Sequence, residues 1–263
     1  MTDSLQSYLD FATETVHLAG RLTLGYFQAG VRPDLKPDDS PVTIADRQAE
    51  ELIRARIEKT YPSHAIVGEE FGVKETADAS HRWFVDPIDG TKSFIRGVPL
   101  YGVLLGLEIE GTVEVGAAYF PALDDMVYAA SGLGCWWNGR RARVSDVNRM
   151  DRAYVTCSDI GSFARYGREE AFQRILRATY HRAGWGDAYG YSLVATGRAD
   201  LMLDAAMHTW DCGPFPPILK EAGGYFGDWQ GNPTIYANEA LGATARLLPA
   251  VLALIRGDSD LPA

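Results

Sequence analysis

Two stretches near the N-terminus carry apolar residues at the spacing of an amphipathic helix. The first covers residues 4–29, and its apolar positions are Leu5, Tyr8, Leu9, Ala12, Val16, Ala19, Leu22 and Tyr26. A polar stretch with three prolines, VRPDLKPDDSP, follows it. The second runs from about Ile44 to Lys59 and ends at Tyr61-Pro62, because a residue before proline avoids the helical region. We therefore predict two long helices.

Apolar runs of strand length dominate the next part of the chain. Short buried strands are predicted at 64–67 and 82–85, on either side of a charged loop, GEEFGVKETADAS. Three further runs follow within residues 101–130: YGVLLGLEIEG, TVEVGAAYFPA and DMVYAA. Turns at Glu110-Gly111 and Asn138-Gly139 predict two β-hairpins.

The second half of the chain alternates strands and helices. Strands are predicted near 153–157, 182–185 and 200–203, and helices near 169–179, 189–195, 209–222 and 239–255. Such alternation is typical of α/β proteins. We expect an α+β half at residues 1–148 and an α/β half at 149–263, with a seam near 145–152 and no linker long enough to free two independent domains.

Charge limits the choice of partner. The composition is ordinary for a globular protein, with 46% hydrophobic and 23% charged residues, but the formal net charge is −10. An acidic surface repels nucleic acid, and it also repels a phosphorylated metabolite. A site that handles phosphate must therefore bring local positive charge, most simply as bound metal ions. The alternative is that the acidic surface serves only solubility.

Cysteine content and hydropathy indicate a cytoplasmic protein without a membrane span. The three cysteines, Cys135, Cys157 and Cys212, show no CxxC spacing, which suits a reducing compartment. The first twenty residues lack the basic and apolar regions of a signal peptide. No apolar run approaches the roughly 18 residues of a membrane helix.

The most informative motif is the aspartate pair in WFVDPIDGTKSFIRGVP. Pro87 fixes its own backbone and restricts Asp86, and Gly90 permits close approach or a positive φ. The carboxylates of Asp86 and Asp89 and the carbonyl of Ile88 are hard oxygen ligands of the kind that Mg²⁺ prefers. The alternative is a solvated turn, because an isolated D-x-x-D pair arises easily in an acidic chain.

The residues after this turn add a phosphate site. Thr91-Lys92-Ser93-Phe94 is predicted to form the first turn of a helix, whose free N–H groups would bind an anion. Metal ligands and phosphate donors would then share one short stretch of chain. This combination predicts a metal-dependent phosphatase.

Three other carboxylates are candidates for the same site. Glu70 belongs to GEEFG, which follows the predicted strand AIV, where open α/β sheets bind ligands. Asp46 and Asp211 stand in the first turns of predicted helices. For both aspartates the alternative is simple compensation of the helix dipole.

Together, DPIDGT, the upstream GEE and the later WD resemble the inositol monophosphatase superfamily of metal-dependent phosphatases. The resemblance covers nearly the whole chain, from SPVTIAD to WDCGP and EAGG. It implies a layered α-β-α-β-α sandwich, a homodimer, and two or three Mg²⁺ ions in a cleft between the halves. It also implies hydrolysis of a small phosphomonoester by a metal-activated water, without a covalent enzyme intermediate.

The resemblance also assigns residue roles. The implied metal ligands are Glu70, Asp86, Asp89, Asp211 and the carbonyl of Ile88. Asp46 is similar to the aspartate that holds a further, weaker ion, and Thr91 with Glu70 would orient and deprotonate the water. The implied substrate contacts are Gly90, Thr91, Arg182, Trp185, Asp187, Asp204 and Asp211.

The substrate prediction depends on the segment RAGWGDAYGY. Inositol phosphatases carry small residues where this chain has Trp185, Gly186 and Asp187, and W-G-D-x-Y-G-Y resembles the histidinol-phosphatase branch. L-Histidinol phosphate carries an ammonium group and an imidazole, which a carboxylate at Asp187 would favour over a neutral inositol ring. The structural alternative makes Asp187 a surface turn residue and Trp185 a core anchor. The functional alternatives are an inositol or sugar-phosphate phosphatase, and a regulatory partner of RNA or protein.

Overall fold

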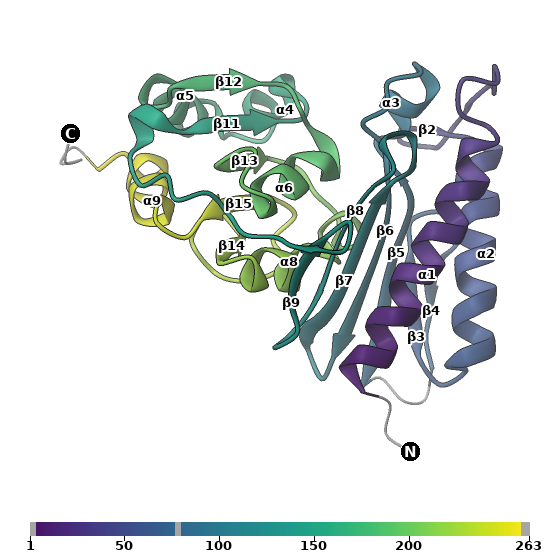
Figure 1. Cartoon of the computed structure of the whole chain (residues 1–263). Coiled ribbons are helices and arrows are strands. Elements are labelled where there is room, and N and C mark those ends of the chain that lie inside the picture. The colour runs from purple at the N-terminus through teal and green to yellow at the C-terminus, as the bar shows by residue number, and fades with distance from the viewer. Residues whose placement is uncertain (1–3, 77–79, 259–263) are drawn as a thin grey trace.

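The computed structural model describes residues 4–76 and 80–258, and it stacks helices and sheets in five layers, α-β-α-β-α (Figure 1). An eight-stranded sheet carries two long helices on its outer face, and a five-stranded sheet carries three helices on its own outer face. Three further helices lie between the two sheets. The layered α/β fold expected from the sequence is confirmed.

Nine α-helices and two short 3₁₀ helices occur in the described residues. The outer helices of the eight-stranded sheet are α1 (Leu5–Leu24) and α2 (Ile44–Thr60). Those of the five-stranded sheet are α4 (Ile160–Arg165), α5 (Glu169–Ala178) and α9 (Leu248–Arg256). Those between the sheets are α6 (Asp187–Ala195), α7 (Thr209–Cys212) and α8 (Phe215–Glu221). The short helices elsewhere are α3 (Thr91–Ile95), η1 (Pro121–Leu123) and η2 (Met150–Arg152).

The strands form one large, one medium and one two-stranded sheet. The large sheet has the order β10 (Arg140–Arg141), β9 (Gly134–Trp137), β8 (Asp125–Ala130), β7 (Thr112–Phe120), β6 (Gly102–Ile109), β5 (His81–Asp89), β3 (Ala65–Gly68), β4 (Gly72–Lys74). The medium sheet has the order β12 (His181–Ala183), β11 (Tyr154–Cys157), β13 (Leu201–Asp204), β15 (Ala240–Thr244), β14 (Gly224–Gly227). The small pair is β1 (Asp34–Leu35) with β2 (Pro41–Val42).

Strand direction differs between the two larger sheets. In the large sheet all neighbours are antiparallel except β3 and β5, which are parallel. In the medium sheet β11 is parallel to both β12 and β13, and β15 is antiparallel to β13 and β14. The parallel pair β3–β5 directs two carboxyl ends to the same edge of the sheet. The functional site lies at that edge.

Helices α1 and α2 begin at side-chain caps and bury one face each. Ser4 Oγ accepts from Ser7 N at 3.2 Å and caps α1. Thr43 and Asp46 form a capping box at the start of α2, in which Asp46 Oδ2 accepts from Thr43 N at 2.8 Å. Most apolar positions of both helices pack on the large sheet, as the periodicity predicted. The first helix ends at Leu24 and not at residue 29, so Tyr26 lies beyond it.

Glycines in the centre of the large sheet let the middle helices approach. A Cβ at Gly116 on β7 would overlap the carbonyl of Pro214, and one at Gly106 on β6 would overlap the carbonyl of Gly213. Close backbone approach at both positions therefore excludes a side chain. This contact joins the α7–α8 segment to the sheet that carries the site.

We expect Gly116→Ala to lower the free energy of unfolding by about 1–3 kcal/mol, because the methyl group meets rigid backbone in a packed core. Gly184→Ala is the matched control, since a Cβ there meets no atom within 4 Å. Urea denaturation of both variants measures the difference. Equal stability of the two variants would contradict the proposed close approach.

Two helix predictions in the second half were wrong in extent. The predicted helix at 209–222 is two helices, α7 and α8, because Pro214 lacks the N–H that a continuous helix needs. The predicted helix at 239–255 is helical only from Leu248, since Ala240–Thr244 pairs with strands on both sides and is buried throughout. There, strand pairing overrides the helix propensity of alanine and leucine.

The predicted hairpins are confirmed, and several short elements were missed. Positive φ angles of 50° and 82° at Glu110 and Gly111, and of 47° and 76° at Asn138 and Gly139, form the turns. The elements missed from the sequence are β1, β2, β4, α4 and β14 and the two 3₁₀ helices. Strand β4 lies in the predicted charged loop, of which residues 77–79 lie outside the described residues.

Within the described part of the chain, no helix has the length and hydropathy needed to cross a membrane.

Candidate active site

A cavity of about 270 Å³ opens where the end of β5 faces the starts of α6 and α7. Its walls combine carboxylates, hydroxyls and two cationic side chains. The lining residues are Glu69, Asp86, Ile88, Asp89, Gly90, Thr91, Lys92, Ser158, Asp159, Ser162, Arg165, Tyr166, Asp187, Asp204, Ala206, Met207 and Asp211. The cavity therefore collects residues from both sheets.

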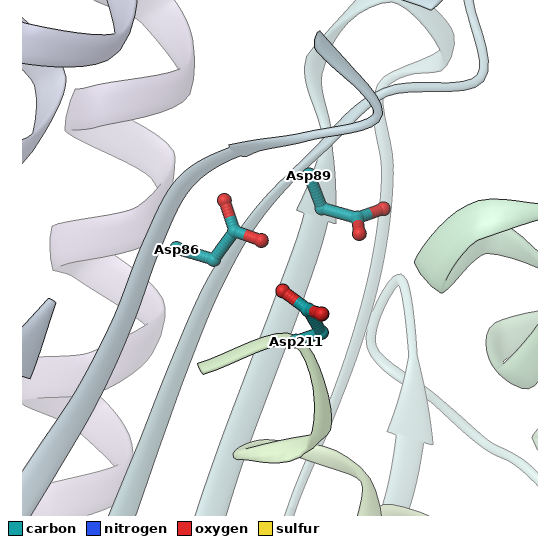
Figure 2. Close-up of side chains that lie close together, drawn as sticks. All are labelled: Asp86, Asp89 and Asp211. Carbon is teal, nitrogen blue, oxygen red and sulfur yellow. The ribbon is translucent and has the colours of Figure 1, made fainter. Parts of the chain in front are cut away.

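Three carboxylates converge in this cavity (Figure 2). Asp86, Asp89 and Asp211 each offer an oxygen, and these oxygens all lie within 4.8 Å of one another. Side chains alternate between the two faces of a strand, so aspartates three residues apart would normally point to opposite faces. The pairing of β5 with β6 shifts register between Asp86 and Asp89, so the strict alternation is broken and both side chains can point to the same side. The proline-containing turn thus brings both carboxylates into one cluster.

Backbone N–H groups fix the orientation of each carboxylate. Asp86 Oδ1 accepts from Ile88 N at 3.1 Å, and Asp89 Oδ2 accepts from Ala188 N at 2.7 Å. Asp211 Oδ2 accepts from His208 N at 2.8 Å, at the start of α7. Asp211 therefore caps the start of its helix and also faces the other two aspartates.

The three carboxylates of the cluster repel one another, and a bound cation would balance their charge. Burial and then the neighbouring carboxylates raise the pKa of Asp86 and of Asp89 well above the usual range. Burial also raises the pKa of Asp211 to about 7. Buried carboxylates of like charge disfavour ionisation unless a cation balances them. Hard oxygen donors of this number and spacing fit a divalent ion such as Mg²⁺.

The structure places Glu69, not Glu70, at the cavity, which corrects the assignment made from the sequence. Strand β3 ends at Gly68. The backbone of Glu69 still lies beside β5, because Glu69 N donates to Val85 O at 3.2 Å. Glu69 lines the cavity, and its charge is a cause of the raised pKa of Asp86. Glu70 lies one residue further on, where the backbone has turned toward α2, and it is not part of the cavity wall.

A lysine bridges the two glutamates. Lys36 Nζ lies 2.8 Å from Glu69 Oε1 and 2.7 Å from Glu70 Oε1. Burial raises the pKa of Glu70 to about 7. An ammonium group thus stands beside the Glu69 carboxylate at the edge of the cluster, which is consistent with a cation-binding position.

Thr91 and Asp46 form a hydroxyl–carboxylate pair beside the cluster. Thr91 Oγ1 lies 3.1 Å from Asp46 Oδ1 and 3.0 Å from the carbonyl of Ile88. Asp46 is buried, and it accepts from Thr91 as well as capping α2. Gly90 precedes α3 with a φ of 79°, and both Gly90 and Thr91 line the cavity.

Two of the predicted substrate residues, Asp187 and Asp204, line the cavity at the start of α6 and the end of β13. Asp187 begins α6, with Ser93 Oγ 3.3 Å from its Oδ2, and burial raises its pKa. Asp204 Oδ2 accepts from Tyr191 Oη at 2.9 Å, and burial raises the pKa of Asp204 to about 8. Asp187 is therefore a cavity residue and not a surface turn residue.

Arg182 and Trp185 do not reach this cavity. The Arg182 guanidinium donates to the carbonyls of Leu176 and Thr179, and Trp185 is 41% exposed beside His181. Trp185 is thus neither a core anchor nor a lining residue. Both predicted substrate residues lie on the side of the edge strand β12.

The sequence did not predict the part of the cavity wall formed by the end of β11 and by α4. This wall consists of Ser158, Asp159, Ser162, Arg165 and Tyr166. Their spacing of three and four residues is that of one helix face, and Asp159 is the N-cap that accepts from Gly161 N at 2.9 Å. The helix is only six residues long, too short for its periodicity to stand out.

Comparison with known proteins supports a single family. The model of the inositol monophosphatase family matches residues 4–258. The chain belongs to the inositol monophosphatase family. It is therefore a hydrolase of the phosphatase type that acts on phosphomonoesters.

Relatives of this family differ in their named substrates. A histidinol-phosphatase of Chlorobaculum parvum is 40% identical over 242 residues, with 92% of each chain covered. An inositol-1-monophosphatase of Mesorhizobium japonicum is 33% identical over 210 residues, with 78% of each chain covered. The solved inositol monophosphatase of Anabaena (Nostoc) sp. aligns with a TM-score of 0.84 and 28% identity, with 96% of each chain covered.

Proposed function

We propose that this family member is a Mg²⁺-dependent histidinol-phosphatase that converts L-histidinol phosphate to L-histidinol and phosphate. The observation that carries the proposal is the carboxylate of Asp187 in the cavity wall, beside the acidic cluster. It provides negative charge where a cationic leaving group would lie. Similarity to the histidinol-phosphatase of Chlorobaculum parvum supports the same choice.

Five groups would hold two or three Mg²⁺ ions. They are the carboxylates of Glu69, Asp86, Asp89 and Asp211 and the carbonyl of Ile88. When bound, Mg²⁺ supplies positive charge for the phosphate oxygens and lowers the pKa of water. Uncatalysed hydrolysis of phosphate monoesters is among the slowest known reactions, so the site needs this charge. Glu69 takes the metal-ligand role that the resemblance assigned to Glu70.

The chain's own groups would handle the proton and the phosphate. The Thr91 hydroxyl, held between Asp46 and the Ile88 carbonyl, is placed to accept a proton from the attacking water and to pass its own to Asp46. The backbone N–H groups of Gly90 and Thr91 would hold the phosphate. Water attacks phosphorus directly, the bond from phosphorus to the ester oxygen breaks on the opposite side, and this oxygen takes up a proton from solvent water to leave as the alcohol.

The leaving group would face the wall that carries Asp187 and Asp204. Both carboxylates line the cavity, and a charge-assisted hydrogen bond from ammonium or imidazolium would be favourable at either one. A neutral, hydroxyl-rich ring gains less from the same groups. Inositol 1-phosphate is the second candidate substrate, because the Mesorhizobium japonicum relative is named for it.

We also propose a cytoplasmic homodimer. All three cysteines are free and buried, as suits a reducing compartment. The edge strand β12 carries exposed aromatic side chains on its flanks, with Tyr180 59% and Trp185 41% exposed. Exposed aromatic residues beside an unpaired strand edge favour association with a second copy. Arg182 and Trp185 would then belong to that interface.

Phosphate release with Mg²⁺ tests the substrate proposal. We expect kcat/KM for L-histidinol phosphate to exceed that for myo-inositol 1-phosphate by at least about a hundredfold, or about 2.7 kcal/mol. EDTA should abolish both activities. Preference for inositol 1-phosphate would leave the phosphatase activity established and would reject Asp187 as the residue that selects the substrate.

A further inference from the structure

Glu50 is a fully buried carboxylate on α2 that lies outside the cavity wall. Its Oε2 accepts from Glu70 N at 2.7 Å, and its Oε1 accepts from Phe71 N at 3.2 Å. These are the two backbone N–H groups that directly follow Glu69. A buried charge costs free energy unless it is fully paired, so these contacts are strongly constrained.

Arg54, one helical turn further along α2, completes the arrangement. Its Nε lies 2.7 Å from Glu50 Oε1, and its Nη2 donates to the carbonyl of Gly72. The guanidinium also lies over the ring of Phe71, 6.0 Å from its centroid. One carboxylate and one guanidinium of α2 thus hold both ends of the turn between β3 and β4.

Gly68 shows how tightly this pair is packed against the turn. A Cβ at Gly68 would overlap Glu50 Oε1 and come within 2.8 Å of Arg54 Nη2. Gly68 is the last residue of β3, and Glu69 follows it directly with its N–H bonded to Val85 O. The backbone on both sides of Glu69 is therefore fixed, once by β5 and once by Glu50.

We propose that Glu50 and Arg54 are positioning residues that aim the Glu69 carboxylate into the metal cluster. The inference rests on the proposed function, in which Glu69 is a metal ligand. Glu50 touches neither substrate nor metal, and it acts through the backbone of residues 70 and 71. Groups that orient a metal ligand contribute to metal affinity without contacting the ion.

A carboxylate is required because three donors meet it. Arg54 Nε and the N–H groups of Glu70 and Phe71 need two acceptor oxygens. Glutamine has one acceptor oxygen, and its NH₂ group would face an N–H donor. Glu50→Gln therefore leaves the turn partly unpaired while keeping the volume of the side chain.

Mg²⁺ affinity of the whole protein, measured by titration calorimetry without substrate, tests the proposal. We expect Glu50→Gln to weaken Mg²⁺ binding by about ten- to a hundredfold. Glu51→Gln removes the same charge from the next, exposed position and should leave the affinity unchanged. Arg54→Lys keeps the charge but cannot make both contacts, so it should weaken binding in the same direction.

The outcomes separate this inference from the proposed function. A lower melting temperature of metal-free Glu50→Gln with wild-type Mg²⁺ affinity would mean a purely structural role and would overturn the inference. If Glu50→Gln does not fold, Arg54→Lys with wild-type affinity would have the same meaning. Absence of Mg²⁺ binding by the wild-type protein would instead overturn the proposed function.

Discussion

Replacing Asp89 by Asn is expected to lower kcat/KM for a phosphomonoester by at least about a thousandfold, or about 4 kcal/mol. The change removes one charge from the cluster of Asp86, Asp89 and Asp211. The Asn oxygen can still accept from Ala188 N, which lies 2.7 Å from Asp89 Oδ2, so the fold should be preserved. Steady-state kinetics with Mg²⁺ measure the loss.

The same substitution should leave the metal-free protein at least as stable as the wild type. Burial and the charges of Asp187 and Asp211 raise the pKa of Asp89 in the folded state. A carboxylate with a raised folded-state pKa lowers stability as pH rises above its unfolded value of about 3.9. Asn carries no charge, so the stability of the variant relative to the wild type should grow from pH 5 to pH 8 in EDTA.

Asp146→Asn is the matched control for Asp89→Asn. Asp146 has a side chain 95% exposed, and its carboxylate forms a surface ion pair with Arg246. Its replacement should change neither turnover nor melting temperature appreciably. Near wild-type turnover of Asp89→Asn would reject the metal centre. A large loss of metal-free stability in that variant would mean that Asp89 serves the fold.

The sequence predicted the layers and most of the site because local signals agreed with tertiary packing. The apolar spacing of α1 and α2 is also the face that each helix buries on the sheet. Motifs DPIDGT and WD carry Asp86, Asp89 and Asp211, which the structure brings together. The resemblance to the superfamily assigned these separate segments to one site, since spacing along the chain does not place residues 86 and 211 together.

The sequence could not separate Glu69 from Glu70, because both follow the same strand. Which glutamate enters the cavity depends on the turn after β3, and α2 holds that turn through Glu50. Contacts between segments twenty residues apart leave no local signal. The wall from α4 was missed for a similar reason, since only its position opposite β5 makes Tyr166 and Arg165 cavity residues.

Asp187 is expected to select the substrate, and Asp187→Asn tests this with little change in shape. Asp187 has a φ of 52°, a conformation that asparagine tolerates better than alanine, so Asn removes the charge without adding strain. We expect kcat/KM for L-histidinol phosphate to fall about ten- to a hundredfold more than for myo-inositol 1-phosphate, the range of one charge-assisted hydrogen bond. Parallel kinetics on both substrates measure the difference.

A second aspartate of the cavity decides whether the charge must stand at Asp187. Asp159 lines the wall formed by the end of β11 and by α4, and it caps α4. Asparagine is an equally good N-cap, so Asp159→Asn changes charge alone. If Asp187 selects the substrate by a direct contact, Asp159→Asn should leave the preference within about twofold, well under 1.4 kcal/mol. If both variants lose the preference equally, selection comes from the overall negative potential of the cavity. Equal losses on both substrates in Asp187→Asn would remove this residue from the specificity argument while leaving the metal centre intact.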